Sequence, residues 1–130
     1  MSSGGIGLAP ELNVFGEPLQ PCSTSPMTGF FRTGACMVGP DEMARHLVCC
    51  EMTADFLSFS KAVGNDLSTP NPAYGFPGLK AGDRWCLHIL RWREALEAGK
   101  APRIAVLSTN QFALEFVELQ DLKRHAFDLA

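Results

Sequence analysis

Cysteine and histidine side chains carry the clearest potential for chemistry in this 130-residue chain, which has five Cys and three His. Asp83 is a typical N-cap residue, so the sequence predicts that Cys86 lies in the first turn of a helix. The positive end of the helix dipole stabilises a thiolate there, and Arg84 adds positive charge. Cys86 is therefore the candidate nucleophile. The alternative, which is more frequent for such residues, is a buried thiol packed beside Trp85.

Metal binding is a weaker interpretation of the same residues. Structural zinc sites usually contain paired ligands such as Cys-x-x-Cys, and the chain has none. His46 and Cys49 have the spacing of helical ligands, but on a strand they would point to opposite faces. Cys86 and His88 would share a face only on a strand. We therefore assign no metal ligands, and the sequence specifies no cofactor.

A long loop over residues 65–82 contains several polar side chains and many Pro and aromatic residues. Loops of this length are usually functional or disordered, and the aromatic content argues against disorder. Turn chemistry, in which Asx and Ser/Thr side chains bond their own backbone, is the competing interpretation. We group His46 and Asp66 with Cys86 as candidate catalytic residues. The candidate ligand-binding residues are Asn65, Ser68, Thr69, Asp83 and Arg84.

Three elements should position these residues. Alternation predicts a strand over His46–Met52. A helix over 54–63 follows, with Thr53 as its N-cap and Gly64 as its end. The spacing of Trp85 and Trp92 predicts a second helix after Asp83 with both tryptophans on one face. A strand over 85–90 is the rival.

The remaining segments predict further strands and a final helix. A short strand and turn are expected in 28–38, a buried strand over 103–108, a second over 112–117, and a short helix from Leu119. Residues 1–11 should form a flexible tail before a single domain over 12–130. The expected fold class is α+β, a small mixed sheet with helices packed on it and a long ordered loop.

Composition excludes several function classes. The net charge of −3, the pI of about 5.5 and the lack of a basic run argue against nucleic-acid binding. No apolar run reaches the roughly 20 residues of a membrane span, and no signal peptide is recognisable. We therefore expect a cytoplasmic protein with reduced thiols. The odd number of cysteines also argues against a closed disulfide framework.

Many short motifs recur in an order that resembles the bacterial family known as domain of unknown function 2237, over roughly Asn13 to Ala126. They include Asn13-Val14-Phe15-Gly16, Pro21-Cys22-Ser23-Thr24, Gly64-Asn65-Asp66-Leu67-Ser68-Thr69-Pro70, Phe76-Pro77-Gly78-Leu79-Lys80 and Gly82-Asp83-Arg84-Trp85-Cys86. The resemblance implies a compact single-domain protein and carries no established activity. The positions that match best and are able to do chemistry are Cys22, Cys36, His46, Cys49, Asp66, Asp83 and Cys86.

The chain departs from that family pattern at two places. The resemblance implies that the family often has two adjacent cysteines where this chain has Ala35-Cys36. It also implies Cys-Leu-Cys where this chain has Cys86-Leu87-His88. The missing first thiol weakens a disulfide or multi-thiol mechanism, whereas His88 retains a possible metal ligand.

The leading function hypothesis is a binding module or enzyme for a small polar molecule, with a pocket near the 65–86 loop. The alternative is a non-catalytic interaction protein that uses the aromatic loop, with homodimerisation as one form of it. The second alternative is a metal-binding protein. An inward-facing set of loop aromatics favours the first hypothesis, and an exposed patch favours the second.

Overall fold

The computed structural model describes residues 10–129. Its elements are β1 (His46–Glu51), α1 (Ala54–Ala62), β2 (Arg84–His88), α2 (Ile89–Glu97) and α3 (Leu119–Arg124). Three short 3₁₀ helices cover Pro72–Tyr74, Val106–Ser108 and Gln111–Glu115. The predicted α+β class is confirmed, with a sheet of two antiparallel strands. No helix within residues 10–129 is long and apolar enough to cross a membrane.

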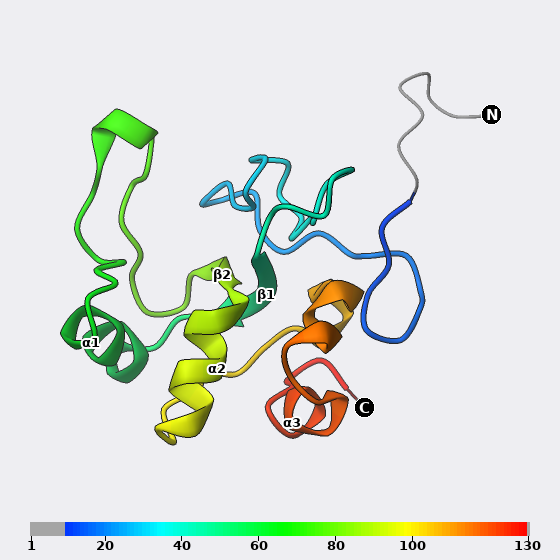
Figure 1. Cartoon of the computed structure of the whole chain (residues 1–130). Coiled ribbons are helices and arrows are strands. Elements are labelled where there is room, and N and C mark those ends of the chain that lie inside the picture. Colours follow the sequence, from blue (N-terminus) through cyan, green and yellow to red (C-terminus); the bar gives the residue numbers. More distant parts are fainter. Residues whose placement is uncertain (1–9, 130) are drawn as a thin grey trace.

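The strands β1 and β2 lie at the centre of the molecule, with α2 directly after β2 (Figure 1). The loop after α1 extends outward as a long arm and returns to β2, whereas the irregular segments before β1 gather on another side. Of the predicted flexible tail, only Pro10 and Glu11 are within the described residues. The Glu11 carboxylate accepts hydrogen bonds from the backbone N–H groups of Val38 and Gly39 and from the side-chain amide of Asn110.

The first strand and first helix agree with the sequence prediction. β1 ends one residue before the predicted limit, and α1 begins at the predicted residue. The Thr53 hydroxyl caps α1 by accepting a 3.0 Å hydrogen bond from the Phe56 N–H. Phe56 and Leu57 are buried and attach the helix to the main core.

The predicted helix after Asp83 is wrong in its first turn. Residues 84–88 form β2, which supplies the hydrogen-bonding partner that β1 requires, and α2 starts only at Ile89. His88 caps it, because its Nδ1 accepts a hydrogen bond from the Leu90 N–H. Trp85 and Trp92 are both buried, but one lies on a strand and the other on a helix. The rival strand interpretation was the better one.

The two strands predicted in 103–117 are also wrong. Ile104 forms isolated bridges with Cys50 and Ala126, and the two 3₁₀ helices follow. Between them Asn110 caps a turn, with its side-chain oxygen accepting from the Phe112 N–H. This local hydrogen bond competes with extended structure. The final helix is confirmed as α3.

Residues 28–38 form turns in place of the predicted short strand. Gly29 and Gly34 have φ values of 98° and 89°, a left-handed conformation that interrupts a strand. A Cβ at Gly29 would lie 2.4 Å from the Ala35 carbonyl oxygen, so the close approach of these turns requires glycine there.

Candidate functional site

Two disulfides occupy one face of the β1–β2 ladder. Cys49 of β1 and Cys86 of β2 are directly opposite each other in the antiparallel register. Cys49 is bonded to Cys22 and Cys86 to Cys36, with Cα–Cα separations of 5.6 and 5.4 Å. The predictions of reduced thiols and of no disulfide framework were therefore wrong. An odd number of cysteines still allows two pairs and one free thiol.

The unpaired fifth cysteine lies on the other face of the same ladder. Cys50 is opposite Trp85 in the register and belongs to the main core. It is fully buried, and this burial raises the pKa of its thiol well above the usual value. A free thiol in that environment behaves as a small apolar side chain.

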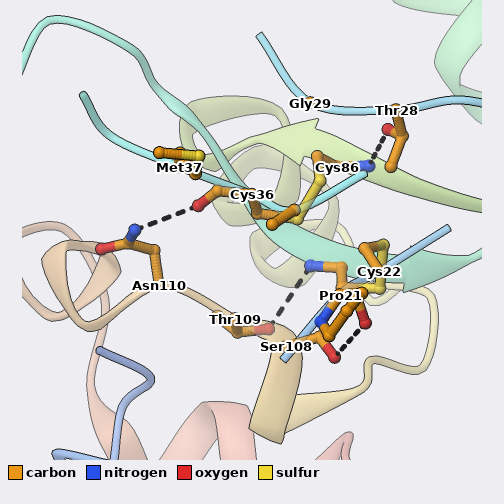
Figure 2. Close-up of a disulfide and its surroundings, with 12 residues drawn as sticks. Pro21, Cys22, Thr28, Gly29, Cys36, Met37, Cys86, Ser108, Thr109 and Asn110 are labelled. Carbon is orange, nitrogen blue, oxygen red and sulfur yellow. Dashed lines mark hydrogen bonds between the residues drawn. A yellow bond between two sulfur atoms is a disulfide. The ribbon is translucent and has the colours of Figure 1, made fainter. Parts of the chain in front are cut away.

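Buried polar side chains hold the backbone at the disulfides (Figure 2). The Thr28 hydroxyl accepts a 2.8 Å hydrogen bond from the Cys86 N–H, and the Asn110 amide donates a 3.0 Å hydrogen bond to the Cys36 carbonyl. The Thr109 hydroxyl accepts from the Cys49 N–H at 3.3 Å.

Next to Cys22, the Ser108 hydroxyl donates a 2.9 Å hydrogen bond to the Pro21 carbonyl. The side chains of one short segment, 108–110, therefore reach three of the four cysteine-bearing segments. Ser108 and its neighbours Thr109 and Asn110 are buried, with 4%, 0% and 3% of their surface exposed. Their hydrogen bonds fix the backbone on which the sulfurs sit.

The sulfur atoms of the two disulfides lie close together. The Sγ atoms of Cys22, Cys36 and Cys49 are all within 4.8 Å of one another. With Cys86 and Ala105, these cysteines form a small buried cluster separate from the main core, and Phe127 packs against it. We call the four bonded cysteines the cysteine cluster.

Cys86 also lines a pocket of about 340 Å³ together with His46, which we call the His46 pocket. Its other lining residues are Gly29, Phe30, Arg32, Tyr74 and Trp85. The structure therefore brings together two of the three predicted catalytic residues. Cys86 is not at a helix N-terminus and not a free thiol, so the physical basis offered for its nucleophilicity was wrong.

The His46 imidazole lies among aromatic rings. It stacks on Phe30 with the centroids 6.1 Å apart and meets His88 edge-on at 5.3 Å. Its Nδ1 is buried and has no hydrogen-bond partner among the described residues. Burial, followed by the charges of His88 and Arg32, lowers the pKa of His46 to about 4, so the ring is neutral at pH 7.

Asp66, the third predicted catalytic residue, lies apart from the His46 pocket in an exposed turn. Its carboxylate accepts hydrogen bonds from the Ser68 and Thr69 N–H groups and from the Thr69 hydroxyl at 2.7 Å. These bonds, with the Thr69 hydroxyl first, lower the pKa of Asp66. Asn65 accepts from the Ser60 hydroxyl through its backbone carbonyl. The polar cluster of the loop therefore shows the turn chemistry that was its competing interpretation.

The two remaining candidate ligand-binding residues, Asp83 and Arg84, lie in different surroundings. Asp83 accepts a hydrogen bond from the Lys80 N–H and forms an ion pair with the Lys80 side chain at 3.3 Å. It shares a second, shallow pocket with Ser68. The Arg84 guanidinium lies 4.7 Å from the centre of the Phe127 ring, next to the cysteine cluster.

Several residues of the site were missed by sequence reasoning. Thr28, Ser108, Thr109, Asn110 and Arg32 carry no local motif that identifies them. One signal was available, since a Ser-Thr-Asn run directly after an apolar stretch is a poor continuation of a strand. The hydrogen-bond partners of this run, however, are distant in sequence: Pro21 is 87 residues from Ser108, and Cys36 is 74 residues from Asn110.

The chain belongs to a protein family of bacteria. Residues 12–126 match the family described as "Uncharacterized protein conserved in bacteria (DUF2237)". This confirms the resemblance found from the sequence motifs. A search of curated proteins finds no match to the chain.

Proposed function

We propose that the protein binds a small planar organic anion, such as an aromatic carboxylate, in the His46 pocket. The observation that carries this proposal is the character of the lining residues. Of these, Arg32 is the one with a permanent charge, no lining side chain is a carboxylate, and three are the aromatic residues Phe30, Tyr74 and Trp85. Apolar walls with few well-placed polar groups are typical of small-molecule sites.

Arg32 is held in place at the pocket by its surroundings. One guanidinium nitrogen donates a 2.7 Å hydrogen bond to the Gly29 carbonyl, and the guanidinium carbon lies 5.4 Å from the centre of the Trp85 ring. The other N–H groups stay available for a carboxylate, which arginine binds with two parallel hydrogen bonds. The residue has a φ of 55°, rare for a residue other than glycine, and such conformations cluster at functional sites.

His46 provides an uncharged polar group beside this cation. Because its pKa lies at about 4, the ring neither repels Arg32 nor attracts a second anion at pH 7. A buried nitrogen without a partner calls for an explanation, and a ligand or a water molecule that it binds would supply one. His46 would therefore select for a polar group next to the carboxylate.

Calorimetric titration with benzoate tests the proposal. Arg32→Gln should weaken benzoate binding about 10- to 100-fold, since a hydrogen bond to a charged group contributes about 1.5–3 kcal/mol. Arg91→Gln is the matched control, because Arg91 lies on α2 and pairs with Glu94. Equal affinity for benzoate and benzyl alcohol, or no heat at millimolar benzoate, contradicts the proposal.

A second candidate function is association with another copy of the chain. Large apolar side chains are exposed around the same pocket: Met27 (44%), Phe30 (45%), Phe31 (39%) and Tyr74 (76%). Aromatic residues and Met are enriched at protein interfaces. Sedimentation velocity at micromolar concentration should show a dimer that Tyr74→Ser weakens and that Leu90→Ser, which changes an exposed residue of α2, leaves intact. A monomer at all concentrations contradicts this candidate.

A further inference from the structure

We propose that the cysteine cluster is a thiol–disulfide relay, in which an external thiol reacts with Cys86 and Cys36 passes the exchange on to the Cys22–Cys49 disulfide. This reaction goes beyond the binding of an anion. It shares the His46 pocket and Arg32 with the proposed anion site, but its reacting atoms are the sulfurs of the cysteine cluster. It assigns a redox role to side chains that otherwise would serve as covalent cross-links alone.

Access identifies Cys86 as the point of attack. It is the one member of the cysteine cluster that lines the His46 pocket. Cys36 and Cys49 are fully buried, Cys86 is 1% exposed, and Cys22, at 6% exposure, does not line this pocket. A thiol that enters the His46 pocket therefore meets Cys86 before the other three bonded cysteines. The Arg32 guanidinium in the same pocket favours the thiolate form of the entering thiol.

The first step is an ordinary exchange reaction. The external thiolate attacks the Cys86 Sγ, a new bond forms between these two sulfurs, and the Cys36–Cys86 bond breaks. The Cys36 sulfur leaves with the bonding electron pair as a thiolate. A second external thiolate then attacks the external sulfur of the mixed disulfide on Cys86. The two external thiols leave as one disulfide, and Cys86 becomes a thiolate that takes up a proton.

The second step follows from the packing of the sulfurs. The Cys36 Sγ lies within 4.8 Å of both sulfurs of the Cys22–Cys49 disulfide, so its thiolate needs only a small movement to attack. Burial disfavours a thiolate. Of the two residues in this disulfide, Cys22 is less buried than Cys49. Attack on Cys49 with Cys22 as the leaving group is therefore favoured. Overall, two external thiols are oxidised to one disulfide, and one of the two protein disulfides is reduced.

The surroundings suit exchange between alternative pairings. The backbone of the cysteine-bearing segments is held by hydrogen bonds to buried Thr28, Ser108, Thr109 and Asn110, none of which involves a sulfur atom. Arg84 and Arg103 lie over the Phe127 ring that packs on the cluster, with distances of 4.7 and 5.6 Å to its centre. The positive charge of Arg84 on this side of the cluster favours a transient thiolate, whereas the charge of Arg103 is paired with Glu51 at 2.7 Å.

Disulfide mapping of the Cys86→Ser variant tests the relay. This variant leaves Cys36 without its partner beside an intact disulfide. Trypsin cleavage after Arg32, Arg45, Lys61 and Arg84 places the four cluster positions on separate peptides. After rapid alkylation, the relay predicts loss of alkylation at Cys36, a new link between Cys36 and Cys49, and alkylation at Cys22. A Cys22–Cys36 link supports the relay with Cys49 as the leaving group. An intact Cys22–Cys49 link with alkylated Cys36 overturns it.

A brief exposure of the wild-type protein to reduced glutathione provides a test that needs no cluster substitution. The relay predicts that glutathione is attached first at Cys86 and that a link from Cys36 to Cys49 or Cys22 follows. Cys50→Ala is the matched control. It removes a thiol on the opposite face, leaves Cys49 as the one cysteine of its peptide, and should not change the exchange.

Glutathione at Cys22 or Cys49 first, or no non-native link, overturns the relay. Benzoate binding is measured without added thiol, so this outcome leaves the proposed anion site unaffected. Conversely, a protein that exchanges disulfides but does not bind benzoate retains the relay and loses the anion site.

Discussion

The two faces of the β1–β2 ladder are built on different physical principles. One face carries Val48, Cys50, Trp85 and Leu87, which enter the main hydrophobic core together with α1 and α2. The other face carries the opposed pair Cys49 and Cys86, which is joined to irregular segments by covalent bonds and surrounded by buried hydroxyl and amide groups.

The difference shows how a small sheet can anchor two kinds of structure. Helices bring their own hydrogen bonds, so their attachment requires only apolar packing. Residues 10–45, which precede β1, contain no helix or strand, and their backbone polar groups need partners from elsewhere. The side chains of Ser108 and Asn110 meet that need at Pro21 and Cys36, and disulfides compensate for the smaller apolar area.

Truncation of the core face should have the largest effect. Trp92 is fully buried in α2, and its indole N–H donates to the Pro102 carbonyl. Trp92→Ala should cost about 3–5 kcal/mol and lower the melting temperature by about 10 °C or more. Leu90→Ala, at an exposed position of the same helix, should change it little. A change of a degree or less for Trp92→Ala would contradict its place in the core.

Removal of a cross-link from the cysteine face should come next. The Cys36–Cys86 disulfide closes a loop with a sequence separation of 50, for which chain entropy predicts about 4 kcal/mol. The double variant Cys36→Ala/Cys86→Ala should lose about this amount in urea unfolding. A reductant, which breaks both disulfides, should also lower the stability of the wild type. Cys50→Ala is the control and should lower the stability less, since Cys50 forms no disulfide.

A single polar contact of the cysteine face should matter less. Thr28→Val preserves the shape but removes the acceptor of the Cys86 N–H, which leaves a buried donor unpaired. The expected loss is about 1–3 kcal/mol in chemical unfolding. Thr33→Val, at an exposed position in the same irregular segment, is the control. Equal stability of the two variants would mean that the hydrogen bond at Cys86 is dispensable.

The smallest expected effect is a pH dependence at the pocket. The pKa of His46 is about 4 in the folded protein and about 6.5 in the unfolded chain. Between these values the unfolded state binds more protons, so stability falls as the pH decreases from 6.5 to 4. His46 is partly exposed, and screening reduces the effect to the order of 1 kcal/mol. His46→Gln should flatten this part of the stability profile, and an unchanged slope would contradict the assigned shift.

Local signals in the sequence were sufficient for part of this fold. The alternation in β1 and the Thr53 cap of α1 both express short-range physics, and both elements formed where expected. The interpretation failed at Arg84–His88 because seven-residue spacing of two tryptophans is compatible with a strand followed by a helix. The decisive influence there is the requirement of β1 for a partner, which no local pattern encodes.

The site was predictable only in outline. His46 and Cys86 were both selected, and both line one pocket, although the reason given for Cys86 was incorrect. The disulfide partners are 27 and 50 residues apart in sequence, and spacing alone cannot pair them. Arg32 reaches the pocket because of turns whose geometry depends on Gly29 and on the close approach of Ala35.

The order of the bonded cysteines along the chain has a consequence for proteolysis. Cys22 joins Cys49 and Cys36 joins Cys86, so the two bonds interleave and every peptide bond between residues 22 and 86 is spanned by at least one of them. A single nick at the exposed Lys80 therefore leaves both fragments in one covalent molecule until a reductant is added. If Cys36 were joined to Cys49, with Cys22 and Cys86 as free thiols, the same nick would leave no covalent link between the fragments even without reductant, because no disulfide would then span Lys80.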